Sequence, residues 1–424
     1  MKTIFRYTNI AVLLAAFIVL GTVASFAQDP CADAEGQTTL GDKFRAEFAD
    51  KSIEGRKKAI ETGKQFLEKY GSCDSAKDLG DYFKGQLPKM EAGLKVLQDQ
   101  KAKDDLTNPF DAALKAKDWD KVYSFGKQIL EKYPDEYRPV EIVLGSIGGE
   151  EAVTKANFKY ADDALVFAKQ SIADLEAGKT FVLANKPAFG FSFFSYPNKD
   201  DAIGWLNYYI GFITNVVKKD KEGALPYLYK ATQAASESKT KAVPYSFIGY
   251  YYAAQGDKLA DEIQALIKAQ DAKDTEEVAK QKVEVIKARV ALFNGTNERA
   301  ADAFARAISR APDAAYKAEI KKALEFSYNR RFGKMDGFDA WVANAQKQPF
   351  ANPTTPVTPI SDPEPTAPAA TSTAPTAPEV KPSAPATKPP AVPAKPATTT
   401  PAKPAATTKP QAKTKKGVVK KKNV

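Results

Sequence analysis

Apolar residues recur every three or four positions from residue 50 to residue 348, and Gly, Pro, Asn and Asp interrupt the runs. In "RKKAIETGKQFLEKYG" (residues 56–71), Ala59, Phe66 and Tyr70 fall on one face of a helix, whereas lysines and glutamates cover the other. Alternation with a period of two is nearly absent. The pattern therefore predicts an all-α body.

A short phrase of this pattern occurs twice. "GKQFLEKYG" (residues 63–71) returns 63 residues later as "GKQILEKYP" (residues 126–134). Around the second copy, a polar turn and an aromatic residue precede Val122, Gly126 and Ile129, and a proline follows at 134. Small residues let one helix lie close to another, and a proline after the helix can start a new unit without breaking a helix interior.

A second stretch, "ARVALFNGTNERAADAFARAISRAPD" (residues 288–313), keeps the same intervals and predicts a turn between two helices at Gly295. Together the stretches resemble tetratricopeptide repeats, and the resemblance implies an array of helical hairpins that grips peptides on its concave face. Corresponding positions are 42 to 76 residues apart rather than 34, so the register between units stays open, and another helical-hairpin solenoid is the alternative. The positions that carry the resemblance are Gly126, Ile129, Pro134, Gly295, Ala300, Phe304, Ala307 and Pro312.

Composition divides the chain into three parts. Residues 1–27 combine Lys2 and Arg6 with an apolar run that ends in "SFA", which resembles a Sec-type signal peptide; a retained anchor is the alternative. Residues 28–348 form the expected repeat domain. Residues 349–424 hold 18 of the 28 prolines and 11 lysines, with no aromatic residue after Phe350, and predict a disordered basic tail.

Charge and residue types narrow the chemistry. Basic and acidic residues balance over residues 28–348, so we expect no nucleic-acid partner, whereas the lysines of the tail favour a spacer or a weak tether to anionic envelope polymer. The chain has no histidine and only two cysteines, which removes histidine-based catalysis and cysteine–histidine zinc sites. We expect no catalytic, cofactor or metal residues.

The two cysteines carry an expectation of their own. In an oxidising compartment Cys31 and Cys73 favour a disulfide, which would close a loop of about 42 residues and stabilise the fold by roughly 4 kcal/mol. Two unpaired buried thiols are the alternative. The bridge would fasten the start of the mature chain to the end of the first strong helix.

Aromatic side chains supply the candidates for binding a partner. Five of them lie in the long connection "KPAFGFSFFSYPNKDD" (residues 186–201), and two tyrosine-rich clusters follow it. Long ordered connections are often functional, and tyrosine suits an interface, although packing in the core is the alternative for each group. The candidates are Phe191, Phe193, Tyr196, Tyr208, Tyr209, Phe212, Tyr250 and Tyr251.

These features predict a periplasmic or secreted adaptor that is not an enzyme and binds a protein or peptide in the cell envelope. After removal of the signal segment, no stable membrane span is expected. The alternatives are a protein that binds cell-wall polymer or a small molecule and, less favoured, a cell-wall enzyme that uses a pair of carboxylates.

Overall fold

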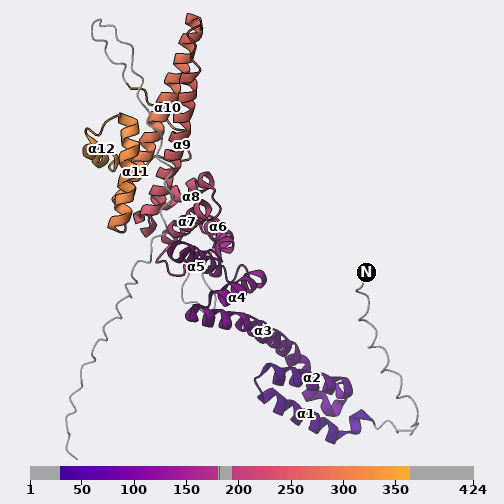
Figure 1. Ribbon diagram of the computed structural model, residues 1–424. Helices are drawn as coiled ribbons and strands as arrows, with labels where there is room; N and C mark the ends of the chain where they lie inside the picture. The colour runs from indigo at the N-terminus through magenta and orange to yellow at the C-terminus, as the bar shows by residue number, and fades with distance from the viewer. Residues whose placement is uncertain (1–28, 180, 182–192, 363–424) are drawn as a thin grey trace, which may run out of the picture. The chain divides into compact units, whose positions relative to one another are not determined.

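The computed structural model describes residues 29–179, 181 and 193–362, and every regular element within them is a helix, as the apolar pattern predicts (Figure 1). The described part divides into two compact units, one up to Ala112 and one from Ala113. Among the described residues, no helix is both long and apolar enough to cross a bilayer. The expected signal peptide (residues 1–27), Phe191 and the tail from residue 363 lie outside the described residues.

The first unit is a small helical bundle around aromatic side chains. The ring of Phe83 packs at 4.6 Å from Phe44 and 5.1 Å from Phe66, between centroids, and all three side chains are buried. Gly63 lets the helices approach, since a Cβ there would lie 2.8 Å from a methyl of Leu87. The elements are η1 (Pro30–Ala32), α1 (Ala34–Ala49), α2 (Ile53–Tyr70), η2 (Asp74–Ala76) and α3 (Lys77–Ala116), of which α3 belongs to this unit up to Ala112.

The predicted disulfide between Cys31 and Cys73 is confirmed. Their Cα atoms lie 5.1 Å apart, and the bridge joins η1 to the residue before η2, three positions after the end of α2. Asp33 secures the same corner: its carboxylate caps α1 by accepting from the N–H of Gly36 at 2.9 Å and also accepts from the Tyr70 hydroxyl at 2.5 Å. The start of the described chain is therefore fastened to α2 by covalent and polar links.

The second unit is built of consecutive helices that pack on their neighbours in the chain. Side-chain caps explain several starts; Asp220, for example, accepts from the N–H of Gly223 at 2.8 Å at the beginning of α8. The elements are α4 (Trp119–Lys132), α5 (Pro139–Lys155), α6 (Ala161–Glu176), α7 (Lys199–Val216), α8 (Lys221–Gln233), η3 (Glu237–Thr240), α9 (Ala242–Lys268), α10 (Glu276–Ile308), α11 (Ala314–Phe332) and α12 (Phe338–Ala345).

Helix α5 is buried on nearly every side between α4, α6 and α7. Its sequence is mostly apolar from Pro139 to Gly149, apart from Glu141 and Ser146, as expected for a helix in the interior of a bundle. Glycines allow the neighbours to come close: a Cβ on Gly145 would lie 2.9 Å from the backbone nitrogen of Ala168. This part of the unit is thus packed backbone against backbone.

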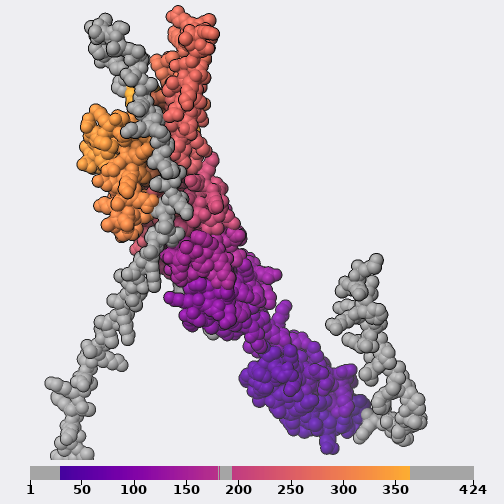
Figure 2. Space-filling view, viewed as in Figure 1, coloured from indigo at the N-terminus to yellow at the C-terminus, as the bar shows by residue number. Residues whose placement is uncertain are grey.

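Helices α9 and α10 form a hairpin, and α11 and α12 lie along α10 (Figure 2). The fully buried ring of Phe304 packs onto Gly249, where a Cβ would lie 2.7 Å from the ring. Ala300 and Ala307 on the same helix are also fully buried. The predicted apolar face of residues 300–307 is therefore the inner face of this hairpin.

The turn predicted at Gly295 is wrong. Residues 276–308 form one continuous helix, α10, and Gly295 is buried in its interior. Gly295 does not form a turn; because it has no Cβ atom, the side chain of Val357 and the backbone of Thr358 can approach the helix closely. Of the other positions, Gly126 and Ile129 are buried in α4, and Pro134 follows the end of that helix. Pro312 lies in the connection before α11.

Removing the bridge with Cys31→Ser and Cys73→Ser should destabilise the first unit by up to about 4 kcal/mol, because the unfolded chain regains the entropy of an open loop. Hydrogen exchange followed by mass spectrometry should show faster exchange in α1 and α2, with α5 of the second unit as internal control. Unchanged exchange in α1 and α2 of the double variant would contradict this prediction. So would a reductant that speeds exchange in the double variant as much as in the wild-type chain.

Candidate functional site: a helical groove that holds residues 350–362

Residues 350–362, named the strap here, lie on the surface of α9, α10 and α11. The sequence pattern places the start of the tail at residue 349, but the structure differs: Phe350 and Val357 pack against the core of the second unit. Of residues 351–362 only Pro353 is buried, and most of the others are exposed. The strap therefore lies in a shallow groove and contacts it at a few points.

The first contact point is an aromatic anchor. The Phe350 ring lies between Tyr245, at 5.3 Å, and Tyr229, at 6.0 Å between centroids, and the Arg306 guanidinium lies 5.0 Å from its centroid. Arg306 also donates to the carbonyl of Gln348 at 2.8 Å. A hollow of about 570 Å³ with a basic rim continues beside Phe350, so the anchor pocket has room for a larger group.

The second contact point is Arg299 on α10. Its guanidinium donates to the carbonyl oxygens of Thr355 at 2.8 Å and Pro356 at 2.7 Å, and more weakly to that of Asn352 at 3.4 Å. Tyr252 on α9 donates to the carbonyl of Pro353 at 3.1 Å. Burial raises the pKa of the Tyr252 hydroxyl above its ordinary value.

The third contact point is Gly295. A Cβ there would lie 2.1 Å from the carbonyl oxygen of Thr358, so only glycine lets the strap backbone lie directly on α10. Next to Gly295, Asn294 donates to the carbonyl of Ile360 at 3.1 Å, and one turn closer to the N-terminus of α10 the carbonyl of Ala291 accepts from the N–H of Ile360 at 2.8 Å. The strap thus runs from the C-terminal end of α10 to the middle of that helix.

The last contact point is an ion pair. Arg331 on α11 lies 2.8 Å from the carboxylate of Asp362 and 3.1 Å from that of Glu298. Arg331 is buried, whereas the Asp362 side chain is largely exposed. The groove therefore ends in a cation that favours a carboxylate.

The predicted partner-binding aromatics lie mostly in the core. Tyr208, Tyr209 and Phe212 on α7 are 4%, 7% and 3% exposed, which leaves a partner almost no surface to contact. Tyr250 and Tyr251 on α9 are partly buried; the Tyr250 ring packs edge-on against Phe304 at 5.0 Å. Consecutive aromatics do point in different directions, but packing against neighbouring helices uses most of them.

The two described members of the aromatic connection also pack inward. Phe193 lies 6.4 Å from Phe181 between ring centroids, and the hydroxyl of Tyr196 hydrogen-bonds with Ser146 at 2.9 Å. Both side chains are partly buried against the core formed by α5, α6 and α7. Phe191, the third candidate of this segment, lies outside the described residues.

Sequence analysis missed the residues that hold the strap. These residues occupy ordinary polar positions of helical patterns, and their spacing does not indicate a common groove. They are Tyr252, Asn294, Arg299 and Arg331. One signal was present: Phe350 is the last aromatic residue and directly precedes the proline-rich run. An isolated aromatic at such a border is costly to leave in water and indicates an anchor.

One buried pair of acids bears on the carboxylate chemistry of the alternative enzyme. Burial raises the pKa of Glu141 to about 7, and its Oε2 atom has no hydrogen-bond partner among the described residues. Asp174, by contrast, accepts from Arg138 at 2.9 Å and Lys179 at 2.8 Å. Both carboxylates are more than nine-tenths buried, which favours a structural role over contact with a substrate.

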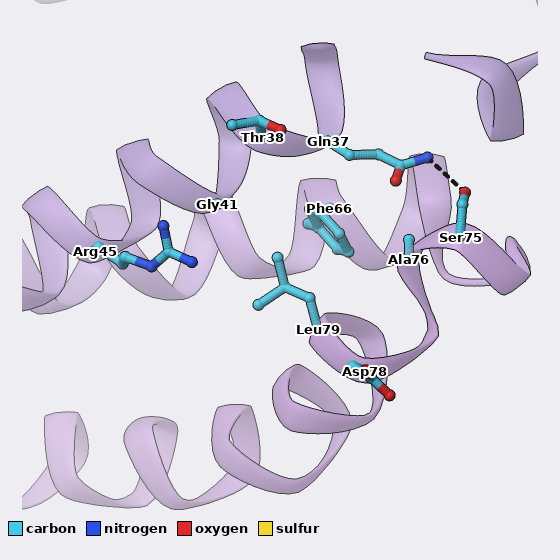
Figure 3. Close-up of a pocket in the computed structure, with 9 residues that line it drawn as sticks. All are labelled: Gln37, Thr38, Gly41, Arg45, Phe66, Ser75, Ala76, Asp78 and Leu79. Carbon is cyan, nitrogen blue, oxygen red and sulfur yellow. Dashed lines mark hydrogen bonds between the residues drawn. The ribbon is translucent and has the colours of Figure 1, made fainter. Parts of the chain in front are cut away.

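The first unit has a smaller hollow between α1 and the start of α3, of about 240 Å³ (Figure 3). Gln37 reaches across it and donates to the Ser75 hydroxyl at 3.0 Å, while Phe66 and Leu79 form its floor. Thr38, Arg45 and Asp78 also line it; Thr38 donates to the carbonyl of Ala34 at 2.9 Å, and Arg45 donates to Asp42. Within the described parts of both units, no group of three or more His, Cys, Asp or Glu residues is placed to hold a metal ion.

Comparisons with models of protein families, with curated proteins and with solved structures found no match for this chain.

Replacing Gly295 with Ala should detach the strap, because the new methyl group would overlap the Thr358 carbonyl. The same substitution should by itself stabilise helix α10 by about 0.5–1 kcal/mol, so release of the strap can be distinguished from loss of the helix. Chymotrypsin should cleave after Phe350 about tenfold faster or more. Gly93→Ala, where no atom lies within 4 Å of the added Cβ, is the control; equal cleavage rates in the two variants would rule out this role for Gly295.

The raised pKa of Glu141 predicts a pH dependence. The folded state holds this proton up to about pH 7, whereas the unfolded carboxyl loses it near 4.5, so the free energy of unfolding should fall by about 3 kcal/mol across that interval. Asp302 contributes to the lower part of this interval, because burial raises its pKa to about 6. Glu141→Gln should therefore remove the slope between about pH 6 and 7 and reduce the rest, whereas Glu176→Gln, at an exposed position, should keep the whole slope. Denaturant unfolding followed by tryptophan fluorescence is suitable, since all three tryptophans (119, 205 and 341) lie in the second unit; a slope above pH 6 that persists in Glu141→Gln would refute the assignment.

Proposed function

We propose that this chain is an exported, non-enzymatic adaptor that binds an extended segment of a protein partner in the cell envelope. The observation that carries the proposal is the strap itself: one face of α9, α10 and α11 holds an extended, proline-rich segment largely through donors to its backbone carbonyls. A surface that binds one extended segment in this way has the chemistry to bind another.

Other features support the cellular setting. The signal-like residues 1–27 and the disulfide between Cys31 and Cys73 fit export to an oxidising compartment. The helical hairpins and the intervals around Gly126 favour a degenerate tetratricopeptide-like array or another helical-hairpin solenoid, whereas the stretch around Ala300 lies in one continuous helix and adds no support. The lysine-bearing tail beyond the strap would act as a spacer or a weak, salt-sensitive tether to anionic envelope polymer.

Affinity capture from envelope extract tests the proposal. The chain from residue 28 to 424 should retain a protein that the Arg299→Ala chain retains several-fold less, because three carbonyl contacts of the groove are lost. A chain ending at residue 362 should retain the same protein, but its binding to purified cell-wall polymer should weaken. Recovery of no protein, together with saturable binding of polymer by both lengths, would replace the adaptor with a polymer-binding protein.

A further inference from the structure

The strap has a regular spacing of prolines. Pro353, Pro356 and Pro359 follow one another at intervals of three residues, and the chain from Pro356 to Asp362 is neither helix, strand nor turn. A polyproline II helix repeats every three residues, so residues three apart share an edge. Pro353 is buried in a turn closed by the N–H of Thr355 and the carbonyl of Asn352, whereas Pro356 and Pro359 are exposed. The edge that the strap turns to the helices after this turn is that of Val357 and Ile360, which are partly buried.

Most polar contacts in the middle of the groove do not depend on the side chains of the bound segment. Arg299 and Tyr252 donate to backbone carbonyls, which every peptide offers, and proline lacks an N–H that would need a partner. Selection by side chain is concentrated at the two ends. Phe350 enters the aromatic pocket, and Asp362, twelve residues later, meets Arg331.

The strap is attached in a way that permits exchange. Between the two ends, only Pro353 is buried, and no covalent link or regular ladder of hydrogen bonds joins the strap to the helices. Its occupancy rests on being part of the same chain, which gives a local concentration on the order of millimolar. A free peptide with similar contacts has to compete with that concentration.

The remaining tail cannot supply a second occupant with the same anchor. Residues 363–424 repeat the proline spacing several times, as in "PAVPAKP", but contain no aromatic residue. Phe350 is thus the one aromatic of the proline-rich region that can fill the pocket formed by Tyr229, Tyr245 and Arg306. Any other ligand of the whole groove has to bring an aromatic residue from another protein.

We infer that the groove recognises an irregular segment with an aromatic anchor, apolar side chains three residues apart and a carboxylate about twelve residues after the anchor, and that the strap is its resident ligand. A partner protein binds by offering a segment of this chemistry, which takes the place of the strap. The inference rests on the proposed function and names both the ligand and the competitor at its site.

A peptide titration of the full chain tests the inference. The probe is a fluorescein-labelled synthetic peptide with the sequence of residues 349–362, and its binding is measured by fluorescence anisotropy. The opened variant, Phe350→Ala with Asp362→Ala, should bind the probe at least tenfold more tightly than the wild-type chain, because its own strap competes less. A probe with alanine in place of its phenylalanine should bind the opened variant at least tenfold more weakly.

The groove side has matched variants. Adding Arg299→Ala to the opened variant should weaken probe binding about tenfold or more, and Arg299→Lys should restore little, because a lysine cannot donate to several carbonyls at once. Lys258→Ala, at an exposed position of α9, is the control and should leave binding unchanged. Circular dichroism and the tryptophan unfolding midpoint establish that each variant is folded.

The outcomes are separable. If a folded opened variant binds no probe, or no more tightly than wild type, the inference fails even when envelope extract yields a partner. If the probe binds as expected but no envelope protein is captured by wild-type or opened chain, the proposed function fails alone. A wild-type dimer in sedimentation velocity that disappears in the opened variant would make a second copy the occupant and overturn the partner assignment.

Discussion

The packing of α9 against α10 is the interaction on which the rest of the second unit depends. The Phe304 ring on Gly249 brings the two helices into close contact, and burying such a ring contributes about 1.5–3 kcal/mol. Because α11 and α12 lie along α10, this contact also sets the positions of Tyr252, Arg299 and Arg331. Those side chains come from three helices but meet one strap, so the groove exists only while the hairpin is closed.

Gly249 and Gly295 both allow a close approach because they lack a Cβ atom, but each admits a different group. Gly249 makes room for an aromatic ring inside the core, whereas Gly295 makes room for a backbone carbonyl on the surface. A glycine inside a helix lowers its intrinsic stability, so both positions are more costly than alanine would be. At Gly295 the lower helix stability is offset by direct contact between the strap and α10, which favours a binding role for this face.

The charges of the second unit are compensated in two different ways. Asp174 is paired with Arg138 and Lys179, and burial raises the pKa of Glu141 to about 7. In the groove, by contrast, Arg299 donates to carbonyl oxygens of the strap, Arg306 to the carbonyl of Gln348 just before it, and Arg331 pairs with the carboxylate of Asp362. The arginines of the groove therefore direct their donors at the segment that crosses the helices.

Local periodicity is enough to predict the helical class and the apolar faces of α2 and α10, and the presence of two cysteines favours their pairing. Long-range packing, by contrast, places Gly295 inside a helix, puts Tyr208 and Tyr209 in the core and returns residues 350–362 to the helices. A helical pattern specifies one buried face but not what covers it. The groove joins residues up to 121 positions apart, such as Tyr229 and Phe350, and no local pattern carries that information.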